Sequence, residues 1–200
     1  GKSGYGYLAD GESDRILQLV NGQVHPVRVL DAAGTYYLRA VLGPPQGPGE
    51  LLVGTSAGSQ LVWSITSSGR SKLVGGTHLP TTQSPPAPGS AVGTDLAVPG
   101  AAVESQGTTY IASYGSSSVL AVRDGRIRTF ARLPFGPISL GATSDGTVYV
   151  SGGHEVDRLD RDGRATRVAG NGASPPGGAP QAGRALDTPL GEGPRIAVGP

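Results

Sequence analysis

The stretch Gly146-Thr147-Val148-Tyr149-Val150-Ser151 decides how this chain is expected to fold. It predicts a short strand, because β-branched and aromatic residues dominate it. A polar loop leads to a second strand-like segment, Val156-Asp157-Arg158-Leu159, and an Asp162-Gly163 turn leads to a third, 164–169. Asp-Gly supplies the positive φ that a tight hairpin needs. The segment therefore predicts an antiparallel meander.

The same pattern occurs three more times in the preceding sequence. The first strands of the four copies are anchored at Tyr7, Leu52, Tyr110 and Tyr149, so the copies are 45, 58 and 39 residues apart. Copies one to three align without a gap, and the fourth has a loop two residues shorter. Another apolar run precedes each later copy, which gives four strands per unit, named A to D in chain order. A repeat of about 40–50 residues made of short strands is typical of β-propeller blades.

We therefore expect an all-β fold, a β-propeller of four-stranded antiparallel blades with about four blades in the sequence. Residues 1–200 are expected to form a single propeller segment. Its parts are strands B to D of a first blade (5–30), three further blades (35–74, 100–131 and 138–169) and a last strand A (194–199). That last strand either closes a ring or belongs to a longer propeller. Four blades is at the low end for closed rings, which favours an arc of a larger propeller of the six-bladed type.

Two inserts rich in proline, glycine and small polar residues interrupt the repeat, at 75–99 and 170–193. Both are too polar to pack a core of their own. They share a pattern, which we align by matching Asp95-Leu96-Ala97-Val98-Pro99 with Ala185-Leu186-Asp187-Thr188-Pro189. The inserts therefore belong to the repeat.

Composition excludes several classes of function. The 16 basic and 15 acidic residues nearly balance, and no basic stripe argues for nucleic acid. The absence of cysteine excludes disulfides and thiolate metal sites. No apolar run approaches the roughly 18 residues of a membrane span, so none is expected in this segment.

At the residue level the chain resembles the NHL repeat family of β-propellers. The resemblance rests on Tyr7-Leu8-Ala9-Asp10 with Arg15-Ile16, and on Val168-Ala169-Gly170-Asn171-Gly172. It covers nearly the whole chain, but the motif Asp and Arg occur together only in the first copy. The resemblance implies recognition of protein or other ligands through one face, in a bacterial, extracytoplasmic setting. Related propellers also include lyases and lactone hydrolases with a metal or His/Glu centre.

The candidate site follows from the order of strands in a propeller. B–C loops and D–A inserts emerge on one face, and function tends to sit where long loops are held by a rigid scaffold. His154 next to Glu155 is the best acid/base candidate, with a plain loop hydrogen bond as the alternative. The other candidates are expected to bind a ligand; they are Glu12, Asp14, Tyr114 and Arg184.

The sequence offers no catalytic or metal motif beyond this pair. A zinc site needs three or four converging ligands, and no Gly-x-Ser-x-Gly, phosphate loop or His-Glu-x-x-His is present. No cofactor is implied. We therefore expect a non-catalytic module that binds or senses a protein or small-molecule ligand, located outside the cytoplasm or secreted. The alternative is a propeller enzyme of the lyase or lactone hydrolase type, with a His/Glu or metal centre at the channel mouth.

Overall fold

The computed structural model describes residues 5–10, 15–27, 38–42, 50–55, 60–66, 71–77, 79, 81–178 and 182–198. These residues form β-strands and one short 3-10 turn, η1 (Pro176–Gly178). All strand pairs within the sheets are antiparallel, and the strands make four separate sheets. The prediction of an all-β fold is confirmed.

Each sheet corresponds to one repeat copy. Blade 1 holds β1 (Tyr5–Asp10), β2 (Arg15–Val20) and β3 (Gln23–Val27). Blade 2 holds β4 (Leu38–Leu42), β5 (Glu50–Thr55), β6 (Gln60–Thr66) and β7 (Ser71–Thr77). Blade 3 holds β8 (Gly89–Ser90), β9 (Pro99–Ser105), β10 (Thr108–Ser113), β11 (Ser118–Arg123) and β12 (Arg126–Arg132). Blade 4 holds β13 (Ser139–Ala142), β14 (Val148–Gly152), β15 (Glu155–Leu159) and β16 (Ala165–Ala169).

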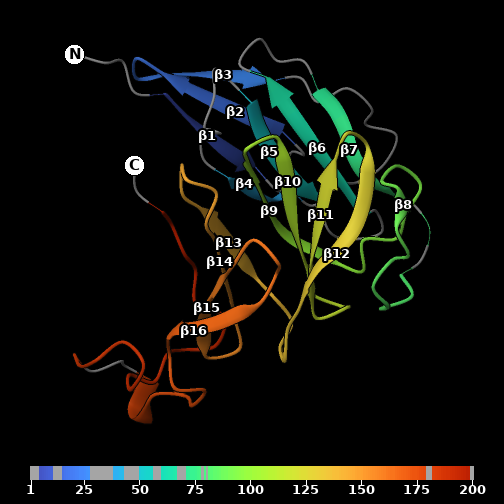
Figure 1. The fold of residues 1–200 in the computed structure, drawn as a ribbon. Coiled ribbons are helices and arrows are strands. Elements are labelled where there is room, and N and C mark those ends of the chain that lie inside the picture. The colour runs from blue at the N-terminus through green and yellow to red at the C-terminus, as the bar shows by residue number, and fades with distance from the viewer. Residues whose placement is uncertain are drawn as a thin grey trace.

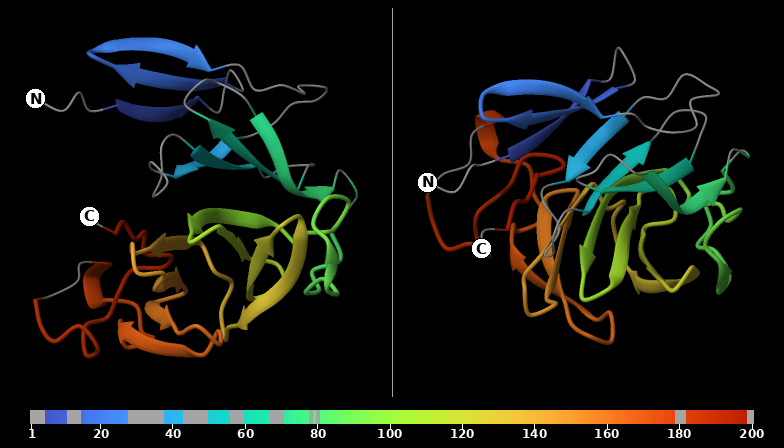
Figure 2. Two further views of the ribbon diagram at one scale, coloured as in Figure 1. Left: turned by 45° about the horizontal axis from the view of Figure 1, so that its top comes forward. Right: turned by 90° about the horizontal axis from the view of Figure 1, so that it is seen from above.

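The four sheets are arranged around a common axis (Figures 1 and 2). Neighbouring blades meet through their inner strands, since β4 contacts β9, and β9 contacts β13. The left view of Figure 2 shows the blades following one another around an arc, with blade 1 at one end and blade 4 at the other. This is the radial arrangement that the repeat predicts, and the protein is a β-propeller.

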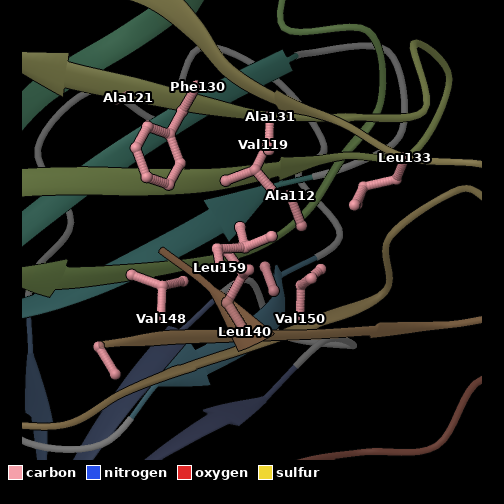
Figure 3. Close-up of a cluster of buried hydrophobic side chains, with 12 residues drawn as sticks. Ala112, Val119, Ala121, Phe130, Ala131, Leu133, Leu140, Val148, Val150 and Leu159 are labelled. Carbon is pink, nitrogen blue, oxygen red and sulfur yellow. The ribbon is translucent and has the colours of Figure 1, made fainter. Parts of the chain in front are cut away.

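The hydrophobic core lies between the blades. Figure 3 shows the cluster between blades 3 and 4, where Val119, Phe130, Leu140, Val150 and Leu159 come together. A second cluster lies between blades 2 and 3 and is built mainly from Val62, Leu96, Ile111, Leu120 and Ile127. Each blade alone would leave one apolar face in water, so stacking around the axis is what removes these side chains from solvent.

A β-bulge recurs at the same place in blades 2, 3 and 4. The register of strand D against strand C skips one residue, and the skipped residues are Val74, Phe130 and Val168. Such a bulge bends the strand and changes which side chains lie on each face of the sheet. In blade 4 it pairs Val156 with Ala169 and the next residue, Asp157, with Arg167.

Three details differ from expectation. Strand D of blade 2 runs to Thr77, so the first insert begins later than residue 75. That insert also contributes β8, a fifth strand, because Gly89 and Ser90 pair with Ile127 and Arg126 on the outer edge of blade 3. Residues 194–198 are not a strand.

Candidate functional site on the loop face

Loops of two kinds lie on opposite faces of the propeller. The loop face comprises the described B–C loops (114–117 and 153–154) and the D–A inserts (79, 81–98, 170–178 and 182–193). The turn face comprises the A–B turns (106–107 and 143–147) and the C–D turns (124–125 and 160–164). The long segments therefore gather on the loop face and along the rim next to it.

The two inserts are anchored to their blades in the same way. The N–H of Gly76 donates to the Ala91 carbonyl at 2.9 Å, and the N–H of Gly170 donates to the Ala185 carbonyl at 2.9 Å. A threonine hydroxyl then closes a turn in each insert; Thr94 Oγ1 bonds the Ser90 carbonyl at 2.5 Å, and Thr188 Oγ1 bonds the Arg184 carbonyl at 2.8 Å. The inserts are thus repeats of each other.

These hydrogen bonds correct the alignment of the two inserts that was made from sequence. The hydrogen bonds match Gly89-Ser90-Ala91 with Gly183-Arg184-Ala185, whereas the sequence alignment placed Ala185 opposite Asp95. The sequence comparison chose the wrong match because both inserts contain several Gly, Ala and Pro residues that align equally well in more than one register.

His154 fastens the second insert to its blade. Its Nδ1 lies 2.8 Å from the Leu190 carbonyl oxygen, to which it donates a hydrogen bond. Nearby, the N–H of Gly193 donates to the Gly153 carbonyl at 2.7 Å, and Ser151 Oγ donates to the Pro194 carbonyl at 2.5 Å. The histidine is therefore one of several groups that dock residues 190–194 onto the B–C loop.

Gln60 occupies the position of His154 in blade 2. A Cβ on Gly170 would lie 2.2 Å from the His154 carbonyl oxygen, and one on Gly76 would lie 1.8 Å from the Gln60 carbonyl oxygen. Gln60 also ties down its own insert, since Nε2 donates to the Leu79 carbonyl and Oε1 accepts from the Val98 N–H, both at 3.4 Å. The pairing of strands B and C shows that the B–C loop of copy two is one residue longer than those of copies one and three. The gapless alignment of the three copies was therefore wrong by one position after this loop.

Glu155 does not pair with His154. It is only 6% exposed and forms an ion pair with Arg167 on the neighbouring strand β16. Asp157 lies two residues along β15, on the same face of the sheet, and is 5% exposed. One of its oxygens, Oδ1, is buried without a hydrogen-bond partner. Two buried carboxylates thus lie near one guanidinium, which forms an ion pair with Glu155 and only partly offsets the charge of Asp157.

The charge on this cluster shifts one pKa. Burial raises the pKa of the Asp157 carboxyl, the adjacent negative charge of Glu155 raises it further, and Arg167 opposes both effects. Burial disfavours the charged form of an acid, and a like charge nearby does the same. The proton of Asp157 is therefore held more tightly than that of an ordinary aspartate, inside the sheet and beneath the loops.

Tyr114 lies where three segments of the loop face meet. Its N–H donates to the Val98 carbonyl at 3.1 Å, and the next residue, Gly115, donates to Ala97 at 2.8 Å. A Cβ on Gly136 would lie 2.7 Å from the tyrosine ring, so the ring rests against that glycine while about half of the residue stays exposed. Glycine at 136 is what allows this close approach.

The first insert is fixed beside Tyr114 by a turn around the half-buried Asp95. Asp95 accepts hydrogen bonds from the N–H and hydroxyl of Thr82, at 2.5 and 2.8 Å, and from the N–H of Ala97 at 2.7 Å. Burial alone would raise the pKa of Asp95, but these hydrogen bonds outweigh it and lower the pKa. The ionised form holds residues 82 and 97 together.

The predicted site residues do not converge. Glu12 and Asp14 lie outside the described residues. Arg184 is exposed and forms an ion pair with Asp187 at 3.6 Å, out in the second insert. Among the residues that the structure describes, no hydrogen bond or ion pair joins Tyr114, His154 and Arg184 to one another.

Sequence reasoning missed Arg167 and Asp157. The Glu155-x-Asp157 spacing places both carboxylates on one face of a strand, and this signal was available in the sequence. The pairing with Arg167 depends on the bulge at Val168, which no residue pattern announces. Within the described part of the chain, no three His, Cys, Asp or Glu side chains gather to hold a metal. No helix there is long and apolar enough to cross a membrane.

Comparisons with known proteins agree on the fold. The structure is similar to virginiamycin B lyase from Staphylococcus aureus, with a TM-score of 0.61 and 14% identity over 94% of this chain and 60% of that one. A catalytically inactive histidine-to-alanine form of that lyase with quinupristin gives 0.58 and 15%, over 84% and 52%. A protein of unknown function from Bacteroides thetaiotaomicron gives 0.62 and 16%, over 97% and 50%.

At these identities the likeness shows the fold alone. The chain spans 60% or less of the length of these three solved structures. No family model matches the sequence, and no curated protein matches it either. The fold and the loop face together define a β-propeller with internally braced inserts, and the resemblance to the NHL family stays a prediction.

Proposed function

We propose that the protein is a non-catalytic binding module whose loop face takes a protein partner. The observation that supports this most directly is the equivalence of His154 and Gln60. A glutamine amide does not titrate in the physiological range and cannot act as a general acid or base. Both side chains tie a D–A insert to its own blade, which favours a structural role for His154 over a catalytic one.

The surface chemistry of the loop face favours a protein as the partner. Leu79, Val92, Tyr114 and Leu186 are each about half exposed or more, and all four belong to this face and its rim. Val92 and Leu186 are equivalent, because each follows the alanine that anchors its insert. Apolar and aromatic side chains presented repeatedly on braced loops suit an extended contact with another protein.

Bracing also reduces the cost of binding. Ordering mobile loops on association consumes part of the interaction free energy. Here the inserts are already held by the hydrogen bonds of Gly76, Gly170, His154 and Asp95. A partner would therefore meet a surface whose backbone is preorganised. In keeping with the expectation from sequence, the proposed setting is outside the cytoplasm.

Site-specific photo-crosslinking tests this proposal. A benzophenone amino acid would replace Tyr114 or Leu186 on the loop face and, as the matched control, exposed Gln23 beside the C–D turn of blade 1 on the opposite face. We expect crosslinks to one protein from the loop-face positions only. With that protein purified, Tyr114→Ser plus Leu186→Ser should weaken the measured Kd at least tenfold without changing the Tm. Equal crosslinking from both faces, or an unchanged Kd, would overturn the proposal.

The enzymatic alternative has its own measurement. Because one structural neighbour is a lyase studied with quinupristin, that compound is a suitable probe for this chain. We expect no turnover by mass spectrometry with or without added Mg²⁺. Turnover by the wild type that disappears in His154→Ala but persists in Leu186→Ser would establish the enzyme instead.

A further inference from the structure

Two adjoining cavities open on the turn face, opposite the surface discussed so far. The larger, of about 430 Å³, lies between blades 3 and 4, and the smaller, of about 260 Å³, continues along blade 4. They share the A–B turn residues Asp145 and Gly146 and the C–D turn residues Asp160 and Arg161. Together they form one groove, which we call the turn-face groove.

The groove carries an excess of positive charge. Its lining includes five arginines but only two carboxylates, which belong to Asp145 and Asp160; the arginines are Arg123, Arg126, Arg128, Arg158 and Arg161. The whole protein is nearly neutral, so this concentration is local. Among the described residues, only Arg123 of these five has a carboxylate within 4.0 Å, on the exposed neighbour Asp124.

The two aspartates are committed to their turns. Asp145 Oδ1 accepts from the hydroxyl of Thr143 and from the N–H of Thr147 at 3.1 Å, and the Thr143 bond above all lowers the pKa of Asp145. Asp160 Oδ1 accepts from the N–H groups of Asp162 at 3.0 Å and Arg164 at 2.8 Å. These carboxylates shape the groove and leave the guanidinium groups free for another anion.

One arrangement of the arginines costs energy in the absence of an anion. Arg123 and Arg126 lie directly opposite each other across the C–D hairpin of blade 3. Like charges in opposite cross-strand positions are destabilising. Arg128 is also held in place, with its guanidinium carbon 5.3 Å from the centre of the Phe130 ring. A stacked guanidinium keeps its planar edge available for hydrogen bonds.

The floor of the groove is aromatic and apolar. Phe130 and Tyr110 meet edge to face, with ring centres 5.0 Å apart, and both line the larger cavity together with Ala121 and Ile127. A ligand that fits must therefore combine separated oxyanions with an apolar group between them. Guanidinium groups bind carboxylates in paired, directional hydrogen bonds.

We propose that the turn-face groove binds an acidic peptide segment of a partner protein. Its Asp or Glu carboxylates pair with Arg126, Arg128 and Arg161, and an apolar side chain lies over Phe130. The regular phosphates of a nucleic acid fit less well, because Asp145 and Asp160 interrupt the positive lining and would repel them. This site is independent of the loop face.

Fluorescence anisotropy with a labelled peptide tests the site. The probe is a twelve-residue peptide of glutamates with one central phenylalanine, compared with its all-glutamine counterpart, a single-stranded RNA and an oligogalacturonate of the same charge. We expect binding of the glutamate peptide alone, weakened at least tenfold in Arg128→Gln plus Arg161→Gln and by raising the salt concentration from 50 to 300 mM. Arg132→Gln, an exposed arginine on β12 outside the groove, is the matched control and should change the Kd less than twofold.

Several results would overturn the proposal. These are absence of peptide binding, equal binding of the all-glutamine peptide, or tighter binding of the RNA or the oligogalacturonate. Loss of binding in the control Arg132→Gln as large as in the double variant would do the same, because it would indicate non-specific attraction. Melting curves check that each variant is folded, since exposed Arg→Gln changes are expected to leave the Tm within about 2 °C.

Discussion

The backbone N–H of Gly170 donates a 2.9 Å hydrogen bond to the carbonyl oxygen of Ala185, which fixes the second insert against the end of β16. Gly170 has a φ of +85°, and a side chain there would meet the B–C loop of the same blade. The contact therefore depends on a residue without a Cβ. It is the point at which rim, loop and insert are joined.

Replacing Gly170 should release the insert. In Gly170→Ala the new Cβ would lie 2.2 Å from the His154 carbonyl oxygen, so the turn must shift. Gly172→Ala is the matched control, because its φ is +82° but its nearest contact would be 3.9 Å away. We expect a loss of about 3 kcal/mol or more for the first and about 1 kcal/mol for the second. Chemical denaturation measures both, and equal losses would contradict the packing described.

Blade-to-blade contact can be tested at the C–D turns. In Gly163→Ala a Cβ would lie 2.0 Å from the Phe130 carbonyl oxygen of the neighbouring blade, whereas Gly125→Ala meets nothing within 4 Å. Both glycines have positive φ, at +82° and +73°. We expect Gly125→Ala to cost about 1 kcal/mol and Gly163→Ala at least twice as much. If urea midpoints shift by the same amount, blades 3 and 4 do not pack as shown.

Removing Arg167 should make the loss of folding stability depend on pH. In Arg167→Met, the buried carboxylates of Glu155 and Asp157 lose the nearby cation, and the pKa of Asp157, already raised by burial and by Glu155, rises further. The added penalty is complete above the folded-state pKa of Asp157 and vanishes below its unfolded value of 3.8. We expect a loss of about 2 kcal/mol at pH 7 and little loss near pH 3.5. Thermal melts across this range measure it, with exposed Arg158→Met as the control.

Asp157 should lower stability at neutral pH in the wild type. Its pKa is raised by burial and by Glu155, so folding is penalised increasingly as the pH rises from 3.8 through the folded pKa. Asp157→Asn keeps the shape and removes the charge. We expect it to be more stable than wild type at pH 7, by on the order of 1 kcal/mol, and no more stable near pH 3.5. A gain that is the same at both pH values would count against this account.

Much of the fold could be predicted from the sequence because Asn-Gly and Asp-Gly pairs indicate the turns of the repeat. Asn21-Gly22, Asp124-Gly125 and Asp162-Gly163 each fall between strands C and D, and Asn21 and Asp124 have the positive φ that such turns require. The strands B of the last two copies, around Tyr110 and Tyr149, begin and end within a residue or two of expectation.

The site was harder to predict because it depends on register. His154 and Glu155 are neighbours in sequence, yet His154 is the last residue of the B–C loop and Glu155 the first residue of β15, so one meets Leu190 and the other Arg167. The fifth strand β8 has two residues in a Pro- and Gly-rich segment and carries no periodic signal. The turn-face groove gathers arginines that are spread from position 123 to 161, and only the stacking of blades brings them together.

The short strand β8 covers an edge of the third blade that would otherwise be open to other chains. A bare outermost strand is a template on which a foreign chain can add, one molecule after another. Where Gly89 and Ser90 pair with Ile127 and Arg126, the third blade already carries a segment of its own chain in that place. The insert that supplies the proposed contact surface therefore also covers the outer edge of blade 3 and protects it from edge-to-edge aggregation.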